Sequence, residues 1–175
     1  MPANPLSLSR QGEIASIVEQ ILLTANKHYP NDSIISIIEA AIPGVRITET
    51  DFDGKTNIRG AIFRKGKDYD TATIAINNTQ TPGDKTFALA HEFGHYMLGH
   101  DGPAHFYIDD KTFDGSDRMQ NEGEANFFAS ILLIPKEQFL KLDAPFVTDA
   151  QLAERFGVSE SMIGVRRRWI ASNGF

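Results

Sequence analysis

The residues with the clearest capacity for chemistry are His91, Glu92 and His95, which form the pattern His-Glu-x-x-His. Residues four apart on a helix lie on one face, so the two imidazoles can bind the same metal ion. Glu92 then lies beside that ion, where its carboxylate can act as a general base. The spacing therefore predicts a site for metal-dependent hydrolysis.

Zinc is the metal that these residue types favour. Two neutral imidazoles and an oxygen ligand suit Zn2+, and a catalytic zinc site keeps its fourth position for water. Zinc lowers the pKa of that water to about 7, so that Glu92 can accept its proton while the water attacks a carbonyl carbon. Glu92 can later pass the proton to the leaving amine.

A third ligand is expected from the helix predicted at about 121–134, which carries an apolar stripe with Glu122 along its edge. Residues two apart on a helix point about 200° apart, so Glu122 and Glu124 cannot both bind the metal from one regular helix. We prefer Glu122 and keep Glu124 as the alternative. Asn126, one turn after Glu122, is expected to accept the free ring N–H of a ligand histidine.

Two residues near the second histidine are weaker candidates for the third ligand. Asp101 stands ten positions after His91, where a related class of zinc sites has its third ligand, but Leu98 replaces the glycine that this class needs. His100 stands nine positions after His91 and misses the ligand position. The donor that stabilises an oxyanion stays open among four side chains: Tyr96, His105, Tyr107 and Arg118.

Composition and length indicate one globular domain, with room at most for a small appendage. Of the 175 residues, 41% are hydrophobic and 23% are charged. No apolar run approaches the roughly 20 residues of a membrane helix, and the N-terminus lacks a signal-peptide pattern. The absence of cysteine excludes disulfide bonds and thiolate metal ligands. We therefore expect a cytoplasmic protein, and the net charge of -6 argues against non-specific nucleic-acid binding.

The segments that must position these residues predict an α+β fold with N-terminal helices, a small sheet, an active-site helix and a ligand helix. Helices are expected at about 12–27, up to residue 41, between Pro82 and Gly99, at about 121–134 and up to residue 142. Three strands rich in β-branched residues are expected to form an antiparallel meander: 45–50, 60–64 and 71–77.

Two further expectations concern the surroundings of the predicted site. Residues 101–120, rich in Asp and Gly, are expected to be irregular and to form a rim for substrate. The strand at 71–77 is expected to leave one edge exposed, where an extended substrate segment can add as a further strand.

The C-terminal residues 151–169 have the pattern of a helix-turn-helix, with a turn at Gly157. Its second helix would carry three consecutive arginines, Arg166, Arg167 and Arg168, which a DNA-binding protein could place on phosphates. Glu160, where that helix would enter a groove, and the acidic chain argue against this use. We favour a packing or docking unit, and we divide the chain into a catalytic domain at 1–145 and a C-terminal segment at 146–175 packed on it.

Two segments in combination resemble the ImmA/IrrE family of metallopeptidases. They are His-Glu-Phe-Gly-His-Tyr-Met-Leu-Gly-His at 91–100 and Glu-Gly-Glu-Ala-Asn-Phe-Phe-Ala-Ser-Ile-Leu-Leu-Ile-Pro at 122–135. The likeness extends from about Val45 to the C-terminus. The resemblance implies a zinc peptidase of minimal gluzincin-like type, in which the ligands match His91, His95 and Glu122 and the catalytic base matches Glu92.

The resemblance also implies a class of substrate, because members of that family cleave helix-turn-helix repressors of the Xre type. The expected function is therefore a zinc-dependent endopeptidase that acts on such a repressor or on an antitoxin. Two alternatives stay open. The chain could be a non-catalytic partner of a repressor or antitoxin, in which the metal only stabilises a docking surface, or a regulator that binds DNA.

Overall fold

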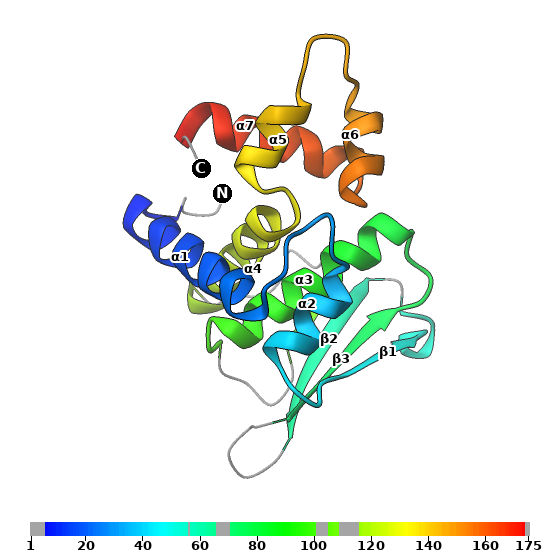
Figure 1. Cartoon of the computed structure of the whole chain (residues 1–175). Coiled ribbons are helices and arrows are strands. Elements are labelled where there is room, and N and C mark those ends of the chain that lie inside the picture. The colour runs from blue at the N-terminus through cyan, green and yellow to red at the C-terminus, as the bar shows by residue number, and fades with distance from the viewer. Residues whose placement is uncertain (1–5, 56, 66–70, 101–104, 109–115, 174–175) are drawn as a thin grey trace.

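The computed structural model describes residues 6–55, 57–65, 71–100, 105–108 and 116–173 (Figure 1). Its helices are α1 (Leu8–Ala25), α2 (Ile34–Ala41), α3 (Pro82–Met97), α4 (Ser116–Leu133), α5 (Lys136–Leu142), α6 (Asp149–Phe156) and α7 (Glu160–Asn173). Its strands are β1 (Arg46–Thr50), β2 (Ile58–Lys65), β3 (Thr71–Asn77) and β4 (His105–Ile108). These elements confirm the α+β class. None of the helices in these ranges is long and apolar enough to span a membrane.

The strands form one mixed sheet in the order β1-β3-β2-β4. Strand β3 runs parallel to β1 and antiparallel to β2, and β2 pairs antiparallel with β4. The predicted antiparallel meander is therefore wrong, since it would have placed β2 between β1 and β3. The four residues at 105–108, expected to be irregular, pair with β2 as a further strand.

Burial on both faces explains why β3 lies inside the sheet. Ala72, Ile74 and Ile76 lie on one face of β3 and Ala75 lies on the other, and all four are at most 7% exposed. A strand that is apolar on both faces is stable only when neighbours cover it, whereas β1 exposes charged side chains and suits an edge. Because β1 and β2 pair with both sides of β3, the expected substrate edge on residues 71–77 does not exist.

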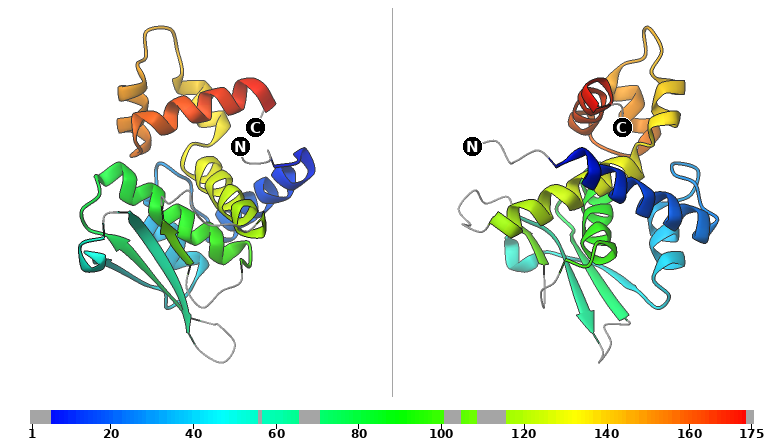
Figure 2. Two further views of the ribbon diagram at one scale, coloured as in Figure 1. Left: turned by 180° about the vertical axis from the view of Figure 1, so that it is seen from behind. Right: turned by 90° about the vertical axis from the view of Figure 1, so that its left-hand side faces the viewer.

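Helix α3 packs along β2 and β3, and α4 packs against α3 (Figures 1 and 2). The Thr81 side chain caps the first turn of α3 by accepting from the Asp84 backbone N–H, and Pro82 follows in the first helical position. Gly94 brings α3 and α4 close together, because a Cβ atom there would lie 3.0–3.2 Å from the Phe128 side chain. The helix predicted between Pro82 and Gly99 is confirmed, and this packing places α4 beside its His-Glu-x-x-His face.

The predicted helix boundaries differ from the observed ones chiefly where a capping residue was overlooked. Helix α1 begins at Leu8, four residues before the predicted start, because Ser7 accepts from the Arg10 backbone N–H. Helix α4 begins at Ser116, five residues before the predicted start. Ser33 caps α2 by accepting from the Ser36 backbone N–H.

The C-terminal helices α6 and α7 lie with α5 in a layer above α1 and α4 (Figure 1). Gly157 ends α6 with a φ of 59°, in the left-handed region that favours glycine. The Tyr29 hydroxyl donates to the Phe156 carbonyl at 2.5 Å, and one hydrophobic core includes residues from Ile14 to Ile163. The two helices of the predicted helix-turn-helix are present, while the division of the chain at residue 146 stays a prediction.

Candidate metal centre

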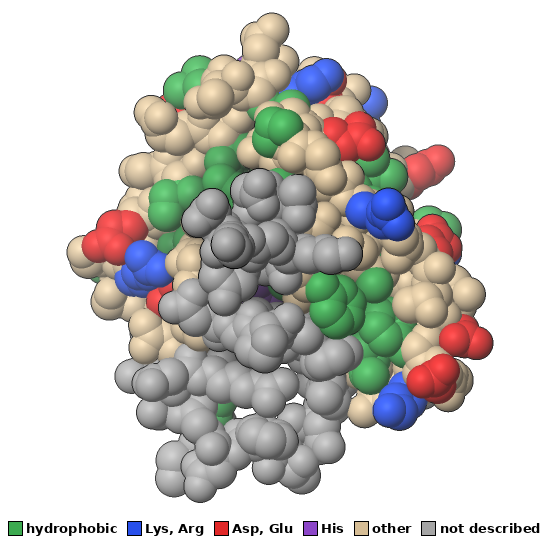
Figure 3. Space-filling model, turned by 90° about the horizontal axis from the view of Figure 1, so that it is seen from below, with side chains coloured by type: hydrophobic (Ala, Val, Ile, Leu, Met, Phe, Trp, Pro, Cys, Tyr) green, Lys and Arg blue, Asp and Glu red, His purple; other side chains and the backbone are tan. Residues whose placement is uncertain are grey.

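Helix α3 carries His91, Glu92 and His95 into the interior, where their exposed fractions are 0%, 0% and 1%. The Nε2 atoms of the two histidines lie 3.0 Å apart. From below the molecule, a small patch of histidine is visible near the centre of the view (Figure 3). The predicted pair thus converges on one buried point.

Helix α4 brings Glu122 to the same point. Its carboxylate oxygens lie 3.2 Å from His91 Nε2 and 3.4 Å from His95 Nε2. One ligand atom from each of these three residues lies within 4.8 Å of the other two, so this group could bind a metal ion. Of the two acids considered from the sequence, Glu122 is the one that faces the imidazoles.

The protonation states of these ligands suit a divalent cation. Burial lowers the pKa of His95 to about 4, so this imidazole is neutral at neutral pH. Burial alone would raise the pKa of Glu122, but the two imidazoles beside its carboxylate outweigh burial and lower that pKa below its usual range. Two imidazoles and one carboxylate form a donor set that zinc accepts.

Asn126 determines which nitrogen of His91 can face a metal. The amide Oδ1 lies 3.0 Å from His91 Nδ1. Because a carbonyl oxygen only accepts, Nδ1 carries the proton, and the Nε2 lone pair is directed to the shared point. Asn126 therefore lies where the sequence interpretation placed it.

A second pair of residues determines the tautomer of His95. His95 Nδ1 lies 2.8 Å from His100 Nδ1, and His100 Nε2 lies 3.2 Å from the Glu124 carboxylate. Since a carboxylate at neutral pH only accepts, His100 donates from Nε2 and accepts at Nδ1. His95 Nδ1 must then be the donor, which leaves the lone pair of His95 Nε2 for a metal.

Sequence reasoning missed this role of His100 and Glu124. Both had been considered only as direct ligands, and the structure places both on the far side of His95. They are buried, with 5% and 2% of their surfaces exposed. The signal that could have revealed them is that a second ligand histidine also needs an acceptor for its ring N–H.

Glu92 is the one member of the motif without a partner among the described residues. Neither carboxylate oxygen accepts a hydrogen bond. Burial raises the pKa of Glu92 well above its usual value, and the charge of Glu122 raises it further. The Ile62 backbone N–H opposes this shift without reaching hydrogen-bond geometry. A buried, unpartnered carboxyl beside a cation site fits a group that exchanges protons with a water molecule or substrate there.

The other side chains considered from the sequence, as third ligand or as donors to an oxyanion, fall into two groups. Tyr96 is half-buried and packs against the hydrophobic core. The remaining ones lie outside the described residues or side chains: Asp101, His105, Tyr107 and Arg118. His105 was expected to lie in an irregular segment. That expectation is wrong for its backbone, which belongs to strand β4.

Two of the three consecutive arginines are engaged within the protein. Arg166 is 2% exposed, donates from Nε to the Ile134 carbonyl at 2.9 Å, and has its pKa lowered to about 10 by burial. Arg167 pairs with Asp143 at 2.7 Å and with Asp149. These contacts join α7 to the end of α4, to the residue after α5 and to the start of α6.

Comparison with known proteins links the chain to one family and one fold. Residues 40–168 match the model of the IrrE N-terminal-like domain, Peptidase_M78. A Mycobacterium tuberculosis transcriptional regulator of known structure has a similar fold, with a TM-score of 0.58 and 16% identity over 92% of this chain. The match covers 48% of that regulator, so the chain spans about half of its length. A comparison with curated proteins gives no match.

Proposed function

The chain belongs to the IrrE N-terminal-like domain family, Peptidase_M78, as the resemblance predicted, and on this premise we propose that it is a zinc-dependent endopeptidase. The observation that carries the proposal is the convergence of His91, His95 and Glu122 beside the unpartnered carboxyl of Glu92. A site built only to stabilise the fold would not need a buried acid without a hydrogen bond.

Each residue of the site has one role in the proposed reaction. His91 and His95 hold the metal through Nε2, and Glu122 supplies the negative charge that balances it in part. A zinc ion bound there supplies a Lewis acid that polarises the scissile carbonyl and acidifies water. Glu92 accepts the proton of the attacking water and donates it to the leaving amine nitrogen.

The raised pKa of Glu92 is compatible with its role as a base. In the absence of a metal, burial and the charge of Glu122 favour its protonated form. A divalent cation bound by the three ligands would favour the charged form of Glu92 and so lower its pKa. Glu92 therefore becomes able to accept a proton only when the site is loaded, which couples the base to the metal.

A protein is the proposed substrate, and a helix-turn-helix repressor or antitoxin is its first candidate class. The family supports this choice. Glu122, whose side chain is 25% exposed, is the most open of the three ligands, so substrate would approach from its side. The alternative is the non-catalytic partner, in which a repressor binds and is not cut.

The test uses repressors encoded beside the gene as substrates. Zinc-loaded wild type and Glu92→Gln are incubated with each repressor, and cleavage is followed by mass spectrometry. We expect cleavage by wild type only, with zinc bound equally by both. Equal cleavage by both proteins would remove Glu92 as the base. Stable association without any cleavage by wild type would favour the non-catalytic partner.

We also propose that α6 and α7 form a packing or docking unit and not a DNA reader. Support comes from Arg166 and Arg167, which contact the protein itself. The likeness to the transcriptional regulator concerns the fold alone at 16% identity. A gel shift that shows sequence-specific binding at physiological salt would overturn this assignment.

A further inference from the structure

A continuous line of polar contacts leads from the metal centre to the N-terminal helix. It starts at His95, passes through His100 to Glu124, and ends at Arg10, whose guanidinium lies 2.5 Å from the Glu124 carboxylate. Glu124 also accepts from the Gln120 side chain at 2.9 Å. Three of these side chains, those of the two histidines and Glu124, are at most 5% exposed, so the line runs through the interior.

Arg10 is the positive charge that balances Glu124. Burial alone would raise the pKa of Glu124, but hydrogen bonds, first that from Arg10, lower it to about 2. A buried carboxylate needs such a partner, because an uncompensated charge in the interior is costly. The same guanidinium contacts exposed Glu13 at 2.9 Å, which gives Arg10 one partner inside the protein and one at the surface.

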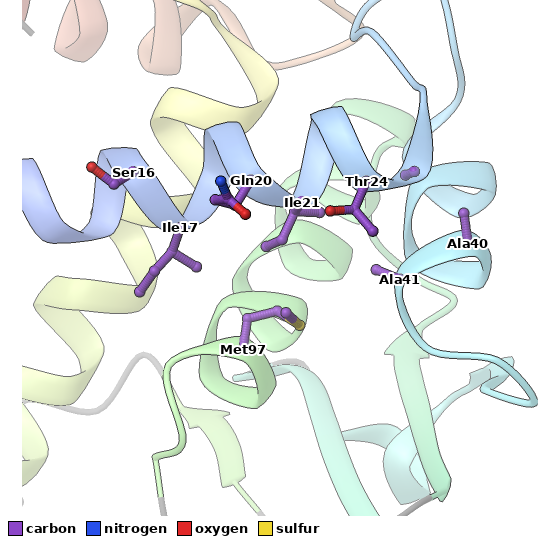
Figure 4. A pocket seen from close by; sticks show the side chains of 9 residues that line it. Ser16, Ile17, Gln20, Ile21, Thr24, Ala40, Ala41 and Met97 are labelled. Atoms are coloured by element: carbon purple, nitrogen blue, oxygen red, sulfur yellow. The ribbon is translucent and has the colours of Figure 1, made fainter.

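Helix α1 lies outside the residues that match the family model, which begin at residue 40. Toward its C-terminal end it faces α2 and the end of α3 across a groove of about 400 Å3 (Figure 4). Ile17 and Ile21 of α1 point there toward Met97. Ile14, Val18 and Ile21 anchor α1 in the hydrophobic core, and the Arg10–Glu124 pair adds a polar link from α1 toward the metal centre.

We propose that α1 is a positioning element of the metal centre, with Arg10 acting through Glu124 and His100 on His95. Arg10 holds Glu124 in place through their ion pair, Glu124 orients His100, and His100 accepts a hydrogen bond from Nδ1 of His95. The Nε2 lone pair of His95 is thereby aimed at the metal. Metal affinity therefore depends on a helix outside the residues that match the family model, and by linkage metal binding tightens the docking of that helix.

This inference rests on the proposed zinc site but not on cleavage, so its test measures metal binding. Zinc affinity of the full-length protein is measured by competition with a chromogenic chelator. We expect Arg10→Ala and Glu124→Gln each to weaken binding, by roughly 10-fold within the 10–100-fold range for groups that orient ligands. Because Arg10 acts through Glu124, the double variant should bind no more weakly than Glu124→Gln alone.

Matched variants separate positioning from general damage. Glu13→Gln removes the surface partner of Arg10 and should leave zinc affinity unchanged, while Arg10→Lys should recover part of the loss. The visible spectrum of bound Co2+ should change in Arg10→Ala and not in Glu13→Gln, while the metal-free Arg10→Ala protein should melt at a lower temperature than wild type, because Glu124 loses its buried partner. If the losses of zinc affinity in Arg10→Ala and Glu124→Gln add in the double variant, Arg10 does not act through Glu124 and the proposed route is overturned.

Hydrogen exchange provides an independent readout of the same coupling. Zinc should slow exchange of the backbone amides of α1 in wild type, and this protection should be absent in Arg10→Ala. Wild type that binds no zinc would contradict the metal centre itself. Wild type and Arg10→Ala that bind zinc equally tightly would overturn only the role of α1.

Discussion

The Nε2 atoms of His91 and His95 lie 3.0 Å apart in the interior. Each ring donates from Nδ1 to its own acceptor, so both lone pairs point to the space that Glu122 also faces. Lone pairs at this distance repel each other unless a positive charge lies between them. The site is therefore arranged for a cation, and its first test is the loss of a ligand.

Glu122→Ala should weaken zinc binding by more than about 100-fold. Loss of a residue that only orients a ligand lowers metal affinity by about 10–100-fold, and Glu122 is itself a ligand. Chelator competition measures the change. Glu137→Ala, on the exposed face of α5, is the control and should bind zinc like wild type. Retained affinity in Glu122→Ala together with a complete loss in Glu124→Ala would transfer the role of third ligand to Glu124.

The raised pKa of Glu92 predicts how the stability of the metal-free protein depends on pH. The folded protein keeps this proton at pH values where the unfolded chain, with a pKa near 4.5, has lost it. The stability that this bound proton contributes is fully present below the pKa of the unfolded chain. It is lost as pH rises through the higher pKa of the folded protein. Wild type should therefore lose stability relative to Glu92→Gln as pH rises above about 4.5.

Urea unfolding of the metal-free proteins at several pH values measures this difference. Saturating zinc should abolish it, because the cation favours the charged form of Glu92. Glu137→Gln serves as a control for the loss of one exposed carboxylate. Parallel pH profiles for wild type and Glu92→Gln would show that the carboxyl titrates alike in the folded and unfolded states.

Local patterns were enough to predict the active-site helix and its ligand helix. Helical periodicity, the break at Pro82 and the spacing of His91 and His95 all act within a few residues. The place of Glu122 could be inferred because a regular helix points Glu124 elsewhere. These features depend on short-range geometry, which the order of residues defines directly.

Long-range pairing could not be predicted in the same way. The partner of β1 is β3, not β2, because burial of both faces of β3 favours a neighbour on each side. The link from His95 through His100 and Glu124 to Arg10 joins three separate helices and the turn after α3. Each contact depends on how whole elements pack, and no local spacing encodes that packing.

Gly60→Ala should lower peptidase activity while zinc stays bound. A Cβ atom at Gly60 of β2 would lie 3.2 Å from both Cγ and Oε1 of Glu92 and 3.1 Å from Ile76. The added methyl displaces the base without touching a metal ligand. Overpacking of this kind costs about 1–3 kcal/mol of stability, which thermal melting can measure.

Gly12→Ala is the matched control for Gly60→Ala, because Gly12 lies within α1 and a Cβ atom there meets nothing within 4 Å. It should stabilise the protein by about 0.5–1 kcal/mol, the gain from replacing glycine inside a helix. Activity should not change. Full activity in Gly60→Ala would mean that Glu92 tolerates displacement, and its role as a precisely placed base would then be doubtful.

Gly83→Ala should destabilise the junction between α3 and the C-terminal helices. A Cβ atom at Gly83 would lie 2.8 Å from the backbone carbon of Val158 and 2.9 Å from the backbone nitrogen of Ser159. Backbone atoms cannot move aside as a side chain can, so the turn between α6 and α7 must shift. We expect the free energy of unfolding to fall by about 1–3 kcal/mol. Each kcal/mol should lower the melting temperature by roughly 2–4 °C.

Gly164→Ala, within α7, is the control for Gly83→Ala, because its new Cβ would make only ordinary contacts at 3.6 Å and beyond. It should melt at or above the temperature of wild type. If α6 and α7 are packed on the domain that carries the site, Gly83→Ala should also lower the single cooperative transition of the whole chain. A separate, lower transition in Gly83→Ala would instead mean that residues 146–175 unfold independently, because the clash at Val158 would then disturb only their own docking.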